Sequence, residues 1–414
     1  MTQKLRIIHV MSDTPPYEEY ADKPRPQFNW DTKGGSWVGI WGYDWDDLLA
    51  IEMCKVDDSF MHEIWQPDLR AEKIYSKEIH PGVVHRLIPA TVKKVRFGIK
   101  KVERLDWSRM IVEIEKVGKE RPIVLRTHDF RLLNSLNNAG STRKIVFSFM
   151  GDITFPAMRF FSLTKNLLSK IDLMKEHLDF MRSVAKLSAI TFMNDHHVDA
   201  LRRFYSGPMY KITMGVDFGR WKKLDKMESR TALGLPAARK ILFMSSRLNQ
   251  LKQVDRFINV LERLSRKYDF LCMISGHGTR EYEARLRDMA QPLQKKGMVE
   301  FLGYVGDEKL QLYYSACDVF VLTSLSEGAS VSVMKALACE TPVFCTNVGN
   351  TAEVLAENGA GMVVPRKDYQ AWEEGLDNIL SGVPVPVLPL ATARNHYHWP
   401  NIAEKFIEVF NRVV

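Results

Sequence analysis

The chain alternates short apolar runs with amphipathic stretches, and this alternation occurs in two successive series. The first series predicts a helix over residues 158–187 and strands over 5–11, 122–126, 144–149 and 189–193. The second predicts helices over 252–267, 279–290, 307–316 and 329–339 and strands over 240–244, 270–274, 299–302, 319–322, 342–345 and 361–364. Such alternation is typical of parallel sheets with helices on both faces.

A glycine-bounded segment near residues 214–235 separates the two series. A length of 414 residues suits two domains of this kind. The sequence therefore predicts two Rossmann-like α/β domains with a cleft between them, where ligands bind near the carboxyl ends of the strands.

Basic side chains are in mild excess, and most of the excess lies in the first half. The chain has 58 Lys and Arg against 50 Asp and Glu, a formal charge of +8. Residues 1–215 carry 33 basic and 27 acidic side chains, or +6 of that total. Basic and apolar residues interleave over 93–101, which fits either a solvated edge of the domain or contact with an anionic or membrane surface. The basic residues form no long stripe, which argues against nucleic-acid binding.

Cysteine usage and hydropathy predict a cytoplasmic protein. The five cysteines include no Cys-x-x-Cys pair and stand in apolar contexts, as expected for buried thiols in a reducing compartment. The apolar run at residues 1–11 is too short and too often interrupted for a signal peptide. No run approaches the 18 or so apolar residues of a membrane-spanning helix.

Arg247 and Lys252 lie between the strand over 240–244 and the helix that follows. A guanidinium and an ammonium at the end of a strand and the start of a helix can hold a diphosphate. Solvated surface charges are the alternative for this pair.

Two glycine-containing loops follow later strands of the second series. Gly276-His277-Gly278 either forms a tight turn or approaches a nucleotide; the third glycine of a dinucleotide fingerprint is absent. In the second loop, Glu327 can accept hydrogen bonds from sugar hydroxyls, and backbone N–H groups at the start of the next helix can hold hydroxyls or phosphates.

Tryptophan and histidine clusters give weaker signals. Five of the nine tryptophans lie between Trp30 and Trp65, which fits either core packing or stacking on a sugar. His196-His197 lacks further ligands at zinc spacing, so we expect no metal site.

In combination, these motifs resemble the retaining glycosyltransferases of family 4, which have the GT-B fold. The resemblance extends over essentially the whole chain, strongly over 240–365 and loosely over 12–120. The resemblance rests on Gly34-Gly35, Thr127-His128-Asp129, Gly215-Val216-Asp217, Arg247 with Lys252, Gly276-His277-Gly278, Phe301 to Val305, Ala316 to Val321, Ser324 with Glu327-Gly328, Pro342-Val343 and Gly361.

The resemblance implies a division of the chain and a donor site. The N-terminal, acceptor-side domain would comprise residues 1–214 plus a returning C-terminal helix within 395–414, and the donor-binding domain would comprise 215–394. The catalytic residues would be His128, Arg247, Lys252 and Glu327. The donor would be a nucleoside-diphosphate sugar, UDP- or GDP-linked, used with no metal or other cofactor and bound by Gly34, Gly35, Gly276, Tyr304, Val305, Gly328, Ala329, Ser330 and Lys335.

Three residues depart from the family pattern. The mildest departure is Asn350, which follows Gly349 where the family has a second glycine, because asparagine tolerates a positive φ. The second glutamate of the Glu-x7-Glu motif, which grips the ribose in the family, is Lys335 here. Lys335 could approach a phosphate, pair with Glu353 or Glu340, or mark a lost donor site. Glu340 replaces a glycine that would favour a left-handed helix cap.

We therefore expect a retaining glycosyltransferase that transfers a sugar to a glycan, lipid-linked or small-molecule acceptor at the cytosolic face. Contact with an anionic membrane surface would fit the formal charge of +6 on residues 1–215. Two alternatives keep the same fold: a pseudoenzyme that binds a nucleotide or sugar as a scaffold subunit, and an epimerase that converts the donor without an acceptor.

Overall fold

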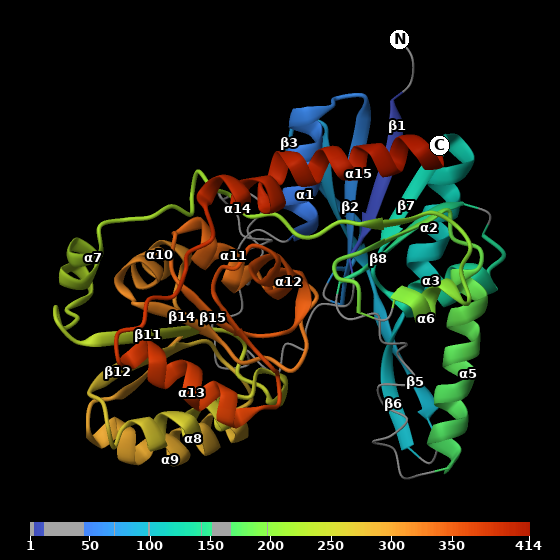
Figure 1. Cartoon of the computed structure of the whole chain (residues 1–414). Helices are drawn as coiled ribbons and strands as arrows, with labels where there is room; N and C mark the ends of the chain where they lie inside the picture. The colour runs from blue at the N-terminus through green and yellow to red at the C-terminus, as the bar shows by residue number, and fades with distance from the viewer. Residues whose placement is uncertain are drawn as a thin grey trace. The chain divides into compact units, whose positions relative to one another are not determined.

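The computed structural model describes residues 4–11, 45–69, 71–97, 100–141, 143–150, 167–196 and 198–414. The chain divides into two compact units (Figure 1). The first comprises Met1–Ile212 together with Ile402–Val414, and the second comprises Thr213–Asn401. The C-terminal helix thus returns to the first unit, as the resemblance implied.

The first unit is built on a mainly parallel sheet. Its strands are β1 (Leu5–Val10), β2 (Phe60–Asp68), β3 (Tyr75–His80), β4 (Val83–Pro89), β7 (Ile123–Thr127), β8 (Lys144–Phe149), β9 (Ala189–Phe192) and β10 (Met209–Lys211), in the order β10-β9-β8-β7-β1-β2-β4-β3. Every neighbouring pair is parallel except β3 and β4. The chain order reverses between β1 and β7, so the carboxyl ends of these two strands flank the switch point of the sheet.

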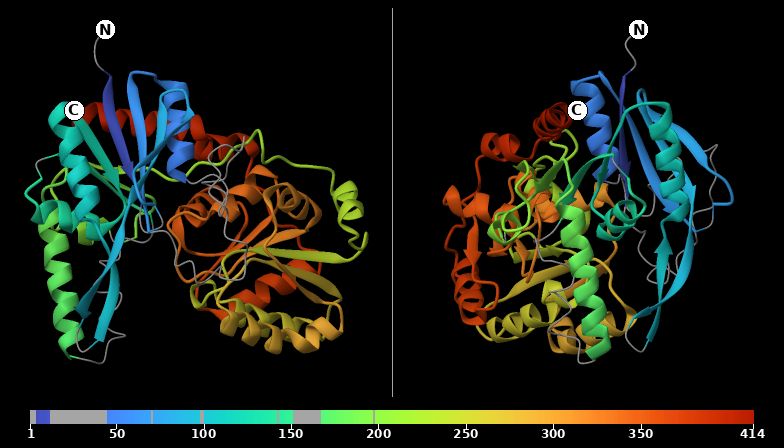
Figure 2. Two further views of the ribbon diagram at one scale, coloured as in Figure 1. Left: turned by 180° about the vertical axis from the view of Figure 1, so that it is seen from behind. Right: turned by 90° about the vertical axis from the view of Figure 1, so that its right-hand side faces the viewer.

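Helices and a hairpin complete the first unit. The helices are α1 (Trp45–Val56), α2 (Ser108–Glu120), α3 (Phe130–Asn138), α5 (Leu167–Val184), α6 (Val198–Arg202) and α15 (Trp399–Val413), which belongs to this unit from Ile402 onward. Strands β5 (Thr91–Phe97) and β6 (Lys100–Asp106) form a separate antiparallel hairpin beside α5, visible in both views of Figure 2. This hairpin contains the basic segment found in the sequence, and its Lys93, Lys94, Arg96 and Lys101 are exposed.

The second unit has a fully parallel sheet. Its strands are β11 (Lys240–Ser245), β12 (Phe270–Ser275), β13 (Val299–Gly303), β14 (Val319–Leu322), β15 (Val343–Thr346) and β16 (Met362–Val364), in the order β13-β12-β11-β14-β15-β16. This is the 3-2-1-4-5-6 order of nucleotide-binding α/β sheets, with its switch point between β11 and β14.

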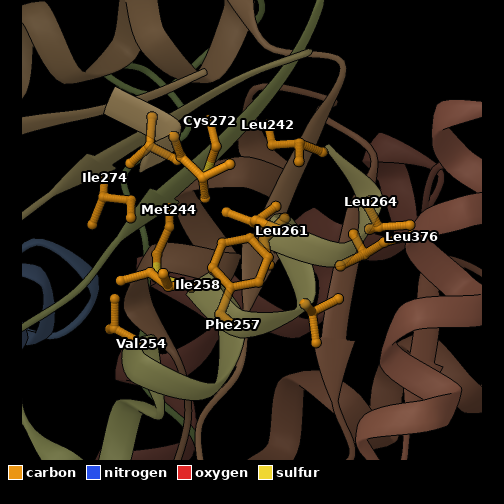
Figure 3. Packing of buried hydrophobic residues seen from close by; sticks show 14 of the residues in the cluster. Leu242, Met244, Val254, Phe257, Ile258, Leu261, Leu264, Cys272, Ile274 and Leu376 are labelled. Carbon is orange, nitrogen blue, oxygen red and sulfur yellow. The ribbon is translucent and has the colours of Figure 1, made fainter. Parts of the chain in front are cut away.

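Helices cover both faces of the second sheet, with α8, α9 and α13 on one face and α10, α11 and α12 on the other (Figure 1). Apolar residues at helical spacing in α8, such as Phe257, Ile258 and Leu261, pack against β11 and β12 (Figure 3). The helical segments are α7 (Lys226–Leu233), the 3-10 turn η2 (Gln250–Lys252), α8 (Val254–Leu264), α9 (Arg280–Lys295), α10 (Asp307–Ala316), α11 (Val331–Ala338), α12 (Gly349–Glu357), α13 (Tyr369–Leu380) and α14 (Leu390–Tyr397).

The predicted strands of both series are present, but β2, β3, β4, β5, β6 and β10 were not predicted. The predicted helices differ in their bounds. The helix predicted over 158–187 is α5 from Leu167 onward; residues 158–166 lie outside the described residues. Its apolar residues Leu167, Ile171, Met174 and Leu178 are exposed. Helix α9 continues past the predicted end at 290 to Lys295, with a proline inside it.

Two expectations concern membranes and thiols. Among the described residues, no helix combines the length and the apolar character that crossing a bilayer requires.

All five cysteines are unpaired, and all are buried except the partly exposed Cys54. Burial raises the pKa of the Cys54 thiol to about 11 and that of the Cys339 thiol to about 12, so both stay protonated at neutral pH.

Candidate functional site

The predicted phosphate-binding residues of the second unit lie at the switch point of its sheet. Arg247 and Lys252 follow β11, and Glu327 follows β14, so the loops after these adjacent strands meet at one edge. Lys252 Nζ forms an ion pair with Glu327 Oε1, which also accepts a hydrogen bond from Ser324 Oγ at 2.6 Å. Arg247, which precedes Lys252 on the same loop, has an exposed side chain. This edge therefore presents cationic groups where nucleotides bind in sheets of this topology.

Gln253 holds these loops in place, and the sequence analysis did not identify it. It adopts a left-handed conformation (φ 50°) between η2 and α8, and it is buried. Its Nε2 donates to the carbonyl oxygens of Thr323 at 3.0 Å and Arg366 at 2.9 Å, and its Oε1 accepts from the Tyr369 hydroxyl. Thr323 Oγ1 in turn donates to the Lys252 carbonyl oxygen at 2.7 Å. The Gln253 amide therefore ties the end of η2 to the neighbouring loop.

Gly276 and Gly278 bring the loop after β12 against the loop after β11. A Cβ atom on Gly276 would lie 1.7 Å from the Ser246 carbonyl oxygen, and one on Gly278 would lie 1.9 Å from that of Leu248. Gly276 also has a positive φ of 135°. Both glycines are thus required by backbone packing. This accounts for the Gly-x-Gly pattern as a tight turn and leaves the nucleotide role of Gly276 as a prediction.

The end of β13 places Tyr304 and Val305 next to His277. The Tyr304 N–H donates to His277 Nε2 at 3.0 Å, so Nδ1 carries the ring proton and donates to Glu283 Oε1 at 3.2 Å. The Tyr304 side chain is 60% exposed, whereas Val305 is buried. An exposed aromatic ring is a group that can stack on a flat ligand group.

The loop before α11 contains Gly328, Ala329 and Ser330, all buried. Ser330 caps α11, and its Oγ accepts from the Val333 N–H. Gly349, at φ 72°, approaches this loop so closely that a Cβ would lie 2.9 Å from the Glu327 carbonyl oxygen. The loop is therefore confined by backbone contacts on the side of α12.

Lys335 has a different partner from those considered in the sequence analysis. Its Nζ lies 3.1 Å from Asp307 Oδ1 and 4.2 Å from the centre of the Trp221 ring. Burial lowers the pKa of Lys335, although Asp307 opposes this shift. Glu340, which we considered as a partner, instead lies 3.7 Å from Lys223. Glu340 itself adopts φ 52°, so a non-glycine residue occupies the left-handed position here.

His128 lies at the switch point of the first unit, in the turn between β7 and α3. Asp129 caps α3 by accepting from the N–H groups of Arg131 and Leu132, both at 2.8 Å, which fixes this turn. His128 Nδ1 lies 4.0 Å from Asp46 Oδ2 at the start of α1. Burial lowers the pKa of His128, although the nearby Asp46 carboxylate raises it. A neutral imidazole near neutral pH can accept or donate a proton.

A buried ion pair supports His128. Arg126 Nη1 pairs with Asp46 Oδ1, and the Arg126 guanidinium lies 4.1 Å from the Trp45 ring centre and 5.2 Å from that of Phe406 in α15.

Trp45 is buried, as is Trp65, whose Nε1 donates to Glu63. These two tryptophans are therefore core residues, whereas the others of the cluster, with Gly34, Gly35 and His197, lie outside the described residues.

No group of three or more potential metal ligands occurs within the part of the chain that the structure describes. The arrangement at both switch points consists instead of cations, carboxylates, backbone N–H groups and one histidine. Such groups can hold an anionic ligand and stabilise charge on a leaving group.

Comparison with known proteins relates the second unit to a family. Residues 225–387 match the family described as Glycosyl transferases group 1. Over 246 residues the chain is 25% identical to a D-inositol 3-phosphate glycosyltransferase of Saccharomonospora viridis, covering 56% of this chain and 57% of that protein. It is 27% identical over 169 residues to the lipopolysaccharide core biosynthesis mannosyltransferase LpsB of Rhizobium meliloti, covering 40% and 48%. The chain spans about half the length of the curated relatives it matches.

Solved structures share the fold along the whole chain. A sucrose-phosphate synthase from Thermosynechococcus elongatus has a TM-score of 0.71 at 14% identity and covers 98% of both chains. Anabaena HepE in complex with UDP-glucose has a TM-score of 0.65 at 14% identity and covers 98% of this chain and 99% of that one. The chain therefore has the GT-B fold of two Rossmann-like domains, as the sequence predicted.

Proposed function

We propose that this protein is a retaining glycosyltransferase that transfers a sugar from a nucleoside-diphosphate sugar to an acceptor. The observation that carries the proposal is the ion pair between Lys252 and Glu327, which spans the switch point of the donor-side sheet beside the exposed Arg247. The match of residues 225–387 to the glycosyl transferases family supports it, as do the sugar-nucleotide complexes of Anabaena HepE.

In the proposed complex, the donor diphosphate replaces Glu327 as the partner of Lys252. The diphosphate binds the guanidinium of Arg247 and the ammonium of Lys252, which then leaves Glu327. The freed Glu327 carboxylate accepts hydrogen bonds from the donor sugar. Tyr304 and Val305 flank the base, and the N–H groups of residues 328–330 bind the sugar or phosphate. Two cations make a metal unnecessary for charge neutralisation.

The proposed reaction proceeds on one face of the sugar. The bond between the anomeric carbon and the diphosphate oxygen breaks, and the acceptor oxygen forms its bond from the same side, which retains the configuration. The acceptor proton passes to the departing phosphate oxygen, whose charge Arg247 and Lys252 stabilise. His128 would lie near the transferred sugar, with Gly34 and Gly35 near the phosphates.

The acceptor side of the proposal rests on the basic hairpin β5–β6. Exposed Lys93, Lys94 and Lys101 favour an acceptor that is anionic or held at an anionic membrane surface. We propose a glycan, lipid-linked or small-molecule acceptor at the cytosolic face. Changing Lys93, Lys94, Lys100 and Lys101 to Gln should reduce binding to anionic vesicles at least tenfold, whereas changing Lys116 and Lys119 of α2 should not.

Turnover of a sugar-nucleotide panel tests the proposed function. We expect release of UDP or GDP from one donor, and NMR of the product should show the anomeric configuration of the donor. Arg247→Ala should lower turnover about 100-fold or more, the usual effect of removing a charge-stabilising donor group. Arg239→Ala is the matched control, because Arg239 pairs with Asp269 at the opposite end of β11. Absence of any nucleotide release across the panel would contradict the proposal.

A further inference from the structure

The second unit holds the segment Arg220–Lys223 through three charged contacts. This connection segment lies a few residues after the boundary between the units at Ile212 and Thr213. Arg220 Nη2 lies 3.0 Å from Asp307 Oδ2, and Lys223 Nζ lies 3.7 Å from Glu340 Oε2. The Trp221 ring packs under the Lys335 ammonium. The contacts therefore come from α10, α11 and the turn that ends α11.

Asp307 joins the connection segment to α11. Its two carboxylate oxygens have different partners: Oδ1 lies 3.1 Å from Lys335 Nζ, and Oδ2 lies 3.0 Å from Arg220 Nη2. Asp307 is also in the first turn of α10, where a negative charge is favourable. One carboxylate thus bridges a cation of α11 and a cation of the connection segment.

Trp221 provides the apolar part of this arrangement. Its side chain is buried, and its ring meets Tyr314 of α10 edge-on at 5.9 Å. The Lys335 ammonium lies against the same indole, so it loses much of its hydration and gains the contacts with Asp307 and the ring. Removing one partner of such a buried pair is strongly destabilising, because the other charge is then left uncompensated.

The connection segment lies near both places where the chain passes from one unit to the other, at Ile212–Thr213 and at Asn401–Ile402. The Val216 N–H donates to the Tyr397 carbonyl oxygen at 2.7 Å, close to the point where the chain returns to the first unit at Ile402. Gly215 lies against Trp399, where a Cβ would come within 2.4 Å of the indole. Both connections between the units are therefore held side by side on the second unit.

Two of the three residues that depart from the family pattern, Lys335 and Glu340, contact the connection segment. We propose that Lys335 is a positioning residue that, through Asp307 and Trp221, fixes the connection segment to α10 and α11, and that it is not a ligand of the donor ribose. Glu340 adds a weaker, more exposed contact to the same segment. This inference concerns the donor-side unit of the proposed function, but the contacts that carry it are independent of any ligand.

Restoring the carboxylate of the family pattern is the direct test. Lys335→Glu places a carboxylate beside Asp307 and over the electron-rich face of Trp221, and both contacts become repulsive. We expect the Tm to fall by about 5 °C or more, with trypsin cleavage after Arg220, Lys222 or Lys223 at least tenfold faster. Adding Asp307→Asn to Lys335→Glu should recover most of both losses, because the repulsion between the two carboxylates is removed and the introduced carboxylate can pair with Arg220. Lys335→Arg should behave as the wild type.

Lys309→Glu is the matched control, since Lys309 is an exposed lysine of α10. It should leave both the Tm and the cleavage rate unchanged. Tighter UDP or GDP binding by Lys335→Glu, at least tenfold and with an unchanged Tm, would overturn the proposal by making position 335 a ribose ligand. Failure of Asp307→Asn to rescue would also overturn it. If the wild type binds neither nucleotide, the proposed function fails, while the Tm and cleavage still decide the role of Lys335.

Discussion

Each of the two sheets has an ion pair at its switch point, and the two pairs differ in how far they are buried. In the first unit, Arg126 and Asp46 have side chains that are 1% and 2% exposed, under Trp45 and Phe406. In the second unit, Lys252 and Glu327 are 16% and 12% exposed, and Arg247 on the same loop is exposed. The first pair is part of the core, whereas the second borders solvent.

This difference separates a structural role from a binding role. A buried pair loses much of its hydration, so its charges cannot be exchanged for a ligand without a large cost. A pair at a solvent-facing edge can exchange one partner for an anion, because water and the ligand replace what is lost. We therefore propose that the Arg126–Asp46 pair positions His128 and that Lys252 and Glu327 bind the donor.

The largest expected effect is the loss of the buried carboxylate. Asp46→Ala leaves the Arg126 guanidinium in the core without the carboxylate that pairs with it, and the free energy of unfolding should fall by about 3–5 kcal/mol. Urea denaturation measures this loss. Asp58→Ala is the control, because Asp58 is 91% exposed in its pair with Lys4, and it should cost less than about 1 kcal/mol. Similar losses in both variants would remove the contrast between buried and solvent-facing charges.

A smaller effect should follow from altering the loop packing of the second unit. Gly276→Ala introduces a Cβ 1.7 Å from the Ser246 carbonyl oxygen, so the loop after β11 must shift. We expect a loss of about 2–3 kcal/mol in unfolding free energy. Gly297→Ala has a positive φ of 63° but no atom within 4 Å of the added Cβ, and it should cost about 1 kcal/mol. Equal losses would mean that the close approach of the two loops contributes nothing.

Acid should destabilise the first unit through a buried histidine pair. His9 Nε2 and His62 Nδ1 lie 3.1 Å apart on β1 and β2, and burial lowers the pKa of His62 to about 4 and that of His9 well below its usual value. The unfolded chain therefore binds protons below about pH 6.5 that the folded chain does not bind. Stability is complete above that pH and decreases as the pH falls towards 4.

For His62 alone, the expected loss between pH 7.5 and pH 5 is about 2 kcal/mol in unfolding free energy. Urea denaturation at the two pH values measures it. His62→Gln should flatten this part of the pH dependence. An unchanged slope in that variant would show that the pair does not stay neutral in the folded protein.

The sequence predicts the second unit better than the first. Strands such as β11 and β14 are almost entirely apolar and buried, so their pattern is read without ambiguity. Strands β2 and β4 were not predicted, because buried polar residues interrupt their apolar pattern. Their charged partners lie far away in the sequence, as in the contacts of Glu63 with Arg6 and of His85 with Asp47.

The same reasoning applies to the site residues. Arg247, Lys252 and Glu327 were predicted as site residues because they follow predicted strands, and the topology brings the last two together. Gln253 was missed because its role depends on a left-handed backbone and on carbonyl groups at least 70 residues away, which no local pattern encodes. The partner of Lys335 was missed for a similar reason, since Asp307 lies on another helix.

Calorimetric titration of UDP and GDP into three variants tests the central claim most directly. If the edge between β11 and β14 binds a diphosphate, Lys252→Ala should weaken binding of one nucleotide about tenfold or more, equivalent to about 1.4 kcal/mol. Glu327→Gln should bind it at least as tightly as the wild type, because Lys252 loses its competing carboxylate. Lys267→Ala, which removes a solvent-exposed lysine paired with Asp377, should have no effect. Equal affinities in the Lys252 and Lys267 variants, or no binding of either nucleotide to the wild type, would contradict the account.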